Sequence, residues 1–312
     1  MHGCADALER LLKKLGYKEQ HGVFQYPDSL SKGTKRQVIF VGDIIDRGPD
    51  ILRCLQIVRA MVDSGHAHIV IGNHEFNALA YYTPVGNGYL RARNARSDKQ
   101  IKATLDALKG NQHLLNDYLS WFSGLPLFLE FDSFRVVHAC WDQIRINSYY
   151  QYYGTHCLTP EAIAECSEYS SIAAQAVERL TRGLSLRLPD DMTMTGRDGF
   201  RRSSFRVCFW AEHYHCYDDI VFQPDPLPEA IRKRPLDDAE KSRLIHYSEE
   251  EKPLFVGHYW LKGEPALVAN NVACLDYSAV NSGKLVAYRL DTSNPILNDE
   301  NFIFVNAFET SL

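Results

Sequence analysis

The chain has 312 residues, enough to bury a large core and to form one large domain or two small ones. Hydrophobic residues make up 45% and charged residues 23%, as in an ordinary soluble globular protein. The net charge is −5, from 34 basic and 39 acidic residues, which argues against a nucleic-acid-binding surface. Any recognition of phosphate must therefore be local. No stretch approaches the roughly 18 apolar residues of a membrane span.

The cysteine content favours a reducing compartment. Eight cysteines are scattered along the chain, and none forms a CxxC pair. No apolar segment typical of a signal peptide follows the N-terminus. We therefore expect free thiols and a cytoplasmic location.

The first part of the sequence alternates helix and strand patterns. Residues 5–15 predict a helix with leucines on one face, and residues 50–62 predict a second helix beginning at Pro49-Asp50. Residues 37–42 and 68–72 predict strands on either side of the second helix. This alternation indicates an α/β protein with a mainly parallel sheet and helices on its faces.

Later segments are less regular. Helices are expected over residues 99–121 and from Thr159 to about residue 180, with a hairpin over residues 127–138. Residues 184–250 are rich in turns, and we interpret residues 141–252 as an insertion that covers the core and supplies substrate contacts. Strands are predicted again at 253–257, 271–275, 284–290 and 302–306. Asn281-Ser282-Gly283 would join the middle pair as a hairpin.

Three short polar blocks follow predicted strands. They are GDIIDRG at residues 42–48, GNHE at residues 72–75 and VHA at residues 137–139. The carboxyl ends of strands in open α/β sheets are where ligands bind. Carboxylate, amide and imidazole groups gathered there are suitable ligands for borderline divalent metals. They do not form the softer kind of site that thiolates make.

These blocks, with a late Gly257-His258, resemble the phosphoprotein phosphatase group of the calcineurin-like metallophosphoesterases. That group includes Ser/Thr protein phosphatases and symmetrical diadenosine tetraphosphatases. The resemblance covers residues 2–140 and 253–290. It implies a single metallophosphoesterase domain over residues 1–312, built as a four-layer α/β/β/α sandwich with a helical and turn-rich insertion.

The resemblance also implies a chemistry. Two divalent ions of the Mn, Fe or Zn type would promote attack by a hydroxide that bridges them. The metal ligands would be His2, Asp43, Asn73, His138 and His258.

The resemblance further implies which residues act on the substrate. His74 would be the general acid, Asp46 would orient it, and Arg47 would bind phosphate oxygens. Arg206 is our candidate for a second phosphate-binding arginine, with Arg91, Arg93 and Arg96 as rivals. The pair His213 and His215 is interpreted as ordinary loop histidines, because no fourth ligand lies nearby in the sequence.

Three functions compete. The pattern of blocks favours a Ser/Thr-type phosphatase, and the alternative is a symmetrical bis(5'-nucleosyl)-tetraphosphatase. Their substrates would be a phosphoprotein, a nucleotide or another phosphorylated small molecule. A degenerate module that binds phosphorylated ligands without hydrolysing them is the third possibility.

The N-terminus departs from the family pattern. The family opens with Gly-Asp-x-His-Gly, whereas this chain begins Met1-His2-Gly3. The matching Asp, and the apolar strand before it, would lie upstream of Met1. We therefore expect the first metal site to be weakened in this polypeptide and the natural product to begin earlier.

Overall fold

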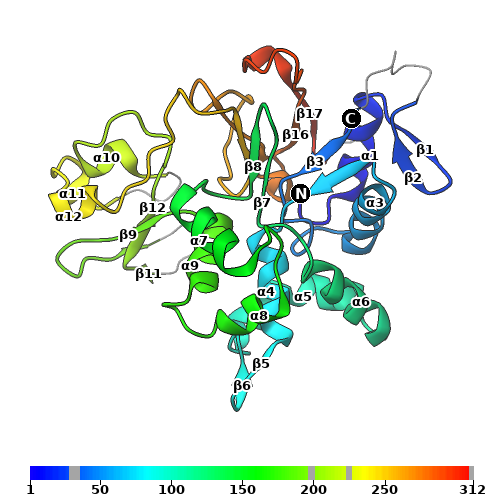
Figure 1. Ribbon diagram of the computed structural model, residues 1–312, viewed down its shortest axis with the longest axis horizontal. Helices are drawn as coiled ribbons and strands as arrows, with labels where there is room; N and C mark the ends of the chain where they lie inside the picture. Colours follow the sequence, from blue (N-terminus) through cyan, green and yellow to red (C-terminus); the bar gives the residue numbers. More distant parts are fainter. Residues whose placement is uncertain (28–35, 196–200, 223–226, 309–312) are drawn as a thin grey trace.

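The computed structural model of the chain describes residues 1–27, 36–195, 201–222 and 227–308 (Figure 1). The α-helices are α1 Ala5–Lys14, α3 Ile51–Asp63, α4 Asn73–Tyr82, α5 Ala95–Ala107, α6 Gln112–Phe122, α7 Gln143–Tyr153, α8 Pro160–Glu165, α9 Ile172–Arg182, α10 Tyr217–Ile220, α11 Glu229–Arg232 and α12 Asp238–Lys241. The strands of the central sheets are β3 Val38–Phe40, β4 Ala67–Ile69, β7 Phe128–Glu130, β8 Arg135–Val137, β13 Leu254–Val256, β14 Val272–Cys274, β15 Asp276–Tyr277, β16 Lys284–Tyr288 and β17 Phe302–Asn306. Short two-stranded ribbons are formed by β1 Lys18–Gln20 with β2 Val23–Gln25, β5 Pro84–Val85 with β6 Gly88–Tyr89, β9 Ser185–Arg187 with β12 Ser204–Arg206, and β10 Met194–Thr195 with β11 Arg201–Arg202.

Three sheets form the centre of the molecule. The largest has the order β14-β13-β8-β7, with β13 parallel to β14 and β8 and with β7 antiparallel to β8. Strands β3 and β4 form a parallel pair, so the strand–helix–strand unit predicted around α3 is confirmed. Strands β15, β16 and β17 form an antiparallel sheet. The predicted α/β class is confirmed.

The layers follow from which side chains are buried together. Val136, Phe255 and Ala273 of the four-stranded sheet share an apolar cluster with Val286 and Phe302 of the three-stranded sheet. These two sheets therefore pack face to face. Helix α1 contacts β16 and β17, and α7 and α9 pack with one another beside the four-stranded sheet. In Figure 1, α7 and α9 and the helix α1 lie on opposite sides of the sheets.

Two predicted helices are each broken in the structure. The expected helix 99–121 is split into α5 and α6, because Gly110 takes a left-handed φ of +81° and the Asn111 side chain accepts from Leu114 N to begin a new helix. The expected helix from Thr159 is split into α8 and α9. Thr159 caps α8 as predicted, and Ser171 caps α9 through Ala174 N at 3.0 Å.

Other boundaries also differ from the sequence prediction. Strand β4 ends at Ile69, and Gly72 caps the unpredicted helix α4, which begins at Asn73. Helix α7 was likewise not predicted. The turn at residues 279–283 joins β15 to β16, because β14 pairs with β13 in the other sheet. The predicted hairpin between residues 271–275 and 284–290 is therefore wrong for β14.

The region after α9 has its own small core. Leu186, Phe205, Tyr217 and Ile231 belong to an apolar cluster separate from the main one, whereas α7 and α9 contribute to the main cluster. In the described part of the chain no helix is both long and apolar enough to cross a membrane.

Candidate metal and phosphate site

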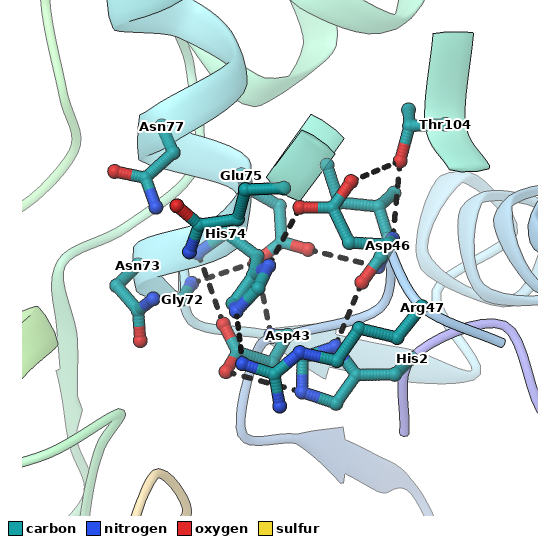
Figure 2. Close-up of polar contacts among 12 residues, drawn as sticks. His2, Asp43, Asp46, Arg47, Gly72, Asn73, His74, Glu75, Asn77 and Thr104 are labelled. Atoms are coloured by element: carbon teal, nitrogen blue, oxygen red, sulfur yellow. Dashed lines mark hydrogen bonds and ion pairs between the residues drawn. The ribbon is translucent and has the colours of Figure 1, made fainter. Parts of the chain in front are cut away.

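Asp43 lies at the centre of a group of polar residues just beyond the end of β3 (Figure 2). Its Oδ2 is 3.7 Å from His2 Nε2 and 3.4 Å from His138 Nε2. Its Oδ1 accepts a hydrogen bond of 3.1 Å from the backbone N–H of His74, in the first turn of α4. The carboxylate therefore lies at a helix N-terminus, where a negative charge is stabilised.

The glycines of the two first blocks allow their backbones to approach closely. A Cβ on Gly72 would lie 2.3 Å from Asp43 Oδ1, and one on Gly42 would lie 2.6 Å from Gly72 N. A Cβ on Gly48 would lie 1.8 Å from His2 O. Any other residue at these positions would force the Asp43 loop away from α4 or from His2.

Glu75 holds these loops together. It is fully buried, and its carboxylate accepts hydrogen bonds from Asp43 N at 2.9 Å, Ile44 N at 2.7 Å and Gly72 N at 3.0 Å. Burial, followed by the nearby Asp43 charge, raises the pKa of Glu75. The last residue of GNHE thus fixes the position of Asp43 without reaching the open side of the site.

The residues form two groups whose ligand atoms lie within 4.8 Å of one another, and both contain Asp43. One group is His2, Asp43 and His74, and the other is Asp43, His138 and His258. Asn73 adjoins the second group, since its Oδ1 lies 3.3 Å from His138 Nε2 and 2.9 Å from His258 Nδ1. All five metal ligands implied by the sequence resemblance therefore lie in one cluster.

The hydrogen-bond pattern of this cluster fits a cation. His138 Nδ1 is 2.5 Å from the carbonyl of Val41, so Nδ1 carries a proton and Nε2 faces the oxygens of Asp43 and Asn73. His2 Nδ1 likewise donates to the Ile45 carbonyl at 2.8 Å. His258 Nε2 is buried and has no hydrogen-bond partner among the described residues. Lone pairs that face one another in a buried place need a cation or a proton between them.

The pKa values of these residues depend on their burial and on the charges that face them. Burial alone would raise the pKa of Asp43, but the facing His138 and His74 outweigh it and hold that pKa well below its usual range. Burial would lower the pKa of His138, and Asp43 reverses this and raises it. For His258, burial and then the charge of Arg206 lower the pKa well below its ordinary value. The cluster therefore holds an ionised Asp43 and a neutral His258.

A second pair, His74 and Asp46, lies beside the first group. His74 Nδ1 is 2.6 Å from Asp46 Oδ2, and both side chains are at most 2% exposed. Thr104, on α5, donates from Oγ1 to Asp46 Oδ1 and accepts from Asp46 N at 3.1 Å. Arg47 Nη2 is 3.2 Å from His74 Nε2. Because guanidinium groups only donate, Nε2 is the acceptor and the single ring proton lies on Nδ1.

The arginines that the resemblance suggests for phosphate binding differ in burial and in their contacts. Arg206 lies over the rings of Phe222 and Tyr259, each centroid 5.8 Å from its guanidinium carbon, and its charge acts on His258. Among its rivals, Arg93 and Arg96 are exposed, whereas Arg91 is partly buried and donates to Asn77 Oδ1 at 2.7 Å. His213 and His215 are exposed, stack with ring centroids 6.1 Å apart, and belong to neither group of ligand atoms.

A cavity of about 1420 Å³ extends from His2 and Asp43 into the interior between α1, β3 and β16. Its walls combine apolar side chains, among them Leu12, Ile39 and Leu285, with basic ones, among them Arg36, Lys284 and Arg289.

Two residues that hold the site in place, Glu75 and Thr104, were not predicted from the sequence. Glu75 had a signal, because a glutamate three residues after Gly72 matches a helix capping box. Thr104 had none, since 58 residues separate it from Asp46.

The sequence matches the family model described as calcineurin-like phosphoesterase over residues 1–165. A curated relative, bis(5'-nucleosyl)-tetraphosphatase PrpE (asymmetrical) of Oceanobacillus iheyensis, is 30% identical over 139 residues, which is 45% of this chain and 52% of the relative. The symmetrical bis(5'-nucleosyl)-tetraphosphatase of Vibrio parahaemolyticus is 32% identical over 139 residues, which is 45% of this chain and 41% of the relative. The chain thus spans about half of the length of the curated relatives it matches.

Among solved structures, one described as a putative diadenosine tetraphosphatase aligns with a TM-score of 0.43 and 15% identity, covering 99% of this chain and 91% of that one.

Proposed function

The chain belongs to the calcineurin-like phosphoesterase family, and we propose that it is a metal-dependent hydrolase of bis(5'-nucleosyl) tetraphosphates. The observation that carries the catalytic part is the sharing of Asp43 between two groups of potential metal ligands beside the His74–Asp46 pair. The substrate part is supported by the names of both curated relatives. It replaces the Ser/Thr-type phosphatase that the pattern of blocks favours.

The residues present fit two divalent cations. We propose that His2 and Asp43 hold one, and that Asp43, Asn73, His138 and His258 hold the other. When bound, such cations polarise a phosphate and lower the pKa of water beside it. The preference for Mn, Fe or Zn follows only from the mixture of carboxylate, amide and imidazole ligands.

The chain's own residues would handle the proton and the phosphate. Arg47 has only donors and lies against His74 Nε2, so we propose that a phosphate group draws the guanidinium onto its oxygens. His74 Nε2 is then free to take the proton that the attacking water loses and to pass it to the leaving oxygen. Asp46 stabilises the charged ring through Nδ1, and Thr104 fixes the Asp46 carboxylate.

We also propose that residues 141–252 contribute substrate contacts, since Arg182 and Arg206 come from this segment and both act electrostatically on His258. A reducing compartment such as the cytoplasm is supported by the eight free cysteines.

The test is to purify the protein, load it with Mn²⁺, measure bound metal, and compare three substrates. These are diadenosine tetraphosphate, a phosphoserine peptide and p-nitrophenyl phosphate. The proposal expects the highest kcat/KM on the tetraphosphate. Two ADP molecules would indicate symmetrical cleavage, and ATP with AMP would indicate asymmetrical cleavage.

The Ser/Thr-type phosphatase remains the second candidate, because DRG and GNHE are both complete in this chain. Higher kcat/KM on the phosphoserine peptide would establish it instead. Metal binding without hydrolysis of any of the three substrates would favour the non-catalytic binding module.

A further inference from the structure

Asn77 lies one helical turn after Asn73 on α4, and the two side chains project from the same side of that helix (Figure 2). Asn77 is 4% exposed. Its Oδ1 accepts from Arg91 Nη1 at 2.7 Å and from Arg182 Nη2 at 2.5 Å. Its Nδ2 is buried and has no hydrogen-bond partner among the described residues. A buried donor without a partner is costly unless a ligand completes it.

Two guanidinium groups therefore converge on one neutral oxygen. Arg182 has an ion pair with Glu178 at 3.0 Å, whose side chain is 69% exposed, and Arg91 donates its other nitrogen to Gln100 at 2.5 Å. Within the described ranges no carboxylate forms an ion pair with Arg91. Burial, and then the charges of Arg182 and Arg96, lower the pKa of Arg91. The positive charge gathered at Asn77 is thus only partly compensated.

The position of this group relative to the metal cluster is informative. One turn of α-helix rises by about 5.4 Å, so Asn77 is displaced by that step from Asn73 at the cluster. Arg91 and Arg182 both donate to Asn77 Oδ1, so their guanidinium groups lie about one helical turn beyond Asn73 along α4.

We propose that Asn77, Arg91 and Arg182 form a second phosphate subsite, which binds a phosphate of the polyphosphate chain adjoining the one held at the Asp43 cluster. The inference rests on the proposed function, because only a substrate with linked phosphates reaches both places. Two planar forks of donors and one amide N–H match the oxygens of a phosphate dianion. The subsite would select a linked polyphosphate over a phosphate monoester.

The competing explanation is that Asn77 only joins α4 to the segment before α5 and to α9. Asn77→Asp separates the two explanations. The carboxylate keeps both contacts to the arginines and strengthens them as ion pairs, so a purely structural role is preserved or improved. The same change removes the Nδ2 donor, neutralises the arginines and repels phosphate.

The experiment measures binding of inorganic tripolyphosphate and of inorganic phosphate to the Mn²⁺-loaded protein by calorimetry, and their inhibition of p-nitrophenyl phosphate hydrolysis. In the wild type we expect tripolyphosphate to bind more tightly than phosphate. Asn77→Asp, Arg91→Ala and Arg182→Ala should each weaken tripolyphosphate binding by about 10- to 100-fold, the range for charge-assisted hydrogen bonds, with a smaller change for phosphate.

Arg187→Ala is the control, because Arg187 is an exposed arginine whose ion-pair partner is Asp191, four residues further along the chain. It should leave both affinities unchanged. Asn77→Asp with wild-type tripolyphosphate binding and an unchanged or higher Tm would overturn the proposal, as would equal losses for both anions.

The readout does not depend on the identity of the natural substrate. If the wild type fails to hydrolyse diadenosine tetraphosphate but binds tripolyphosphate through these residues, the proposed function fails and the subsite stands. If it hydrolyses the tetraphosphate with unchanged KM in all three variants, the subsite fails and the proposed function stands.

Discussion

His74→Asn tests whether His74 gives a proton or holds a metal. His74 lies in one group of potential ligands with His2 and Asp43, yet its Nδ1 is committed to Asp46 at 2.6 Å. An asparagine amide can still donate to Asp46, so the buried carboxylate keeps a partner, but the amide cannot deliver a proton at neutral pH. We expect bound metal to be unchanged and kcat on a phosphoserine peptide to fall by about 10²- to 10⁴-fold, the usual range for general acid catalysis.

The size of the loss should depend on the leaving group. An alkoxide needs a proton to depart, whereas a nucleoside phosphate has a pKa of about 6 and departs as a stable anion. The loss on p-nitrophenyl phosphate and on diadenosine tetraphosphate should therefore be smaller than on the peptide. Steady-state rates on the three substrates, with metal measured by mass spectrometry on the same samples, give the comparison. Equal losses on all three, or loss of one metal per chain, would refute the role as acid.

Three further changes test other parts of the site. Asp43→Asn should release metal from both groups and abolish hydrolysis, since its charge is shared between them; retention of two metals per chain would contradict the sharing. Thr104→Val should lower kcat by about tenfold with metal content unchanged, because Asp46 loses the contact that orients it, and a wild-type rate would show that His74 alone fixes Asp46. The metal-free protein should lose stability as pH falls below about 6.5, because burial lowers the pKa of His258 and only the unfolded chain then takes up its proton. His258→Asn should reduce that slope by up to about 1.4 kcal/mol per pH unit in chemical denaturation, whereas His213→Asn, at an exposed position, should not.

The residues that the sequence singled out lie together in the structure, whereas two of the predicted helices are each broken in two. Asp43, Asn73 and His138 come after the strands β3, β4 and β8, and the carboxyl ends of strands are where α/β proteins bind ligands. The break at Gly110 was missed because apolar periodicity continues across it, and only the left-handed backbone separates α5 from α6. Thr104 and Asn77 could not be predicted. Their roles depend on how α5 and α9 pack, and no local pattern specifies that packing.

The backbone of the site bears on how this protein would evolve. Ten described non-glycine residues have positive φ, and five of them are His2, Asp43, Asp46, Arg47 and His258. Left-handed backbone disfavours residues with a Cβ, although asparagine and aspartate tolerate it. Glycine has no Cβ and adopts it readily. A population selected for heat resistance alone would therefore replace Arg47 and His258 with glycine or asparagine early. Their persistence in a thermally selected library would measure how strongly activity, rather than folding, constrains this chain.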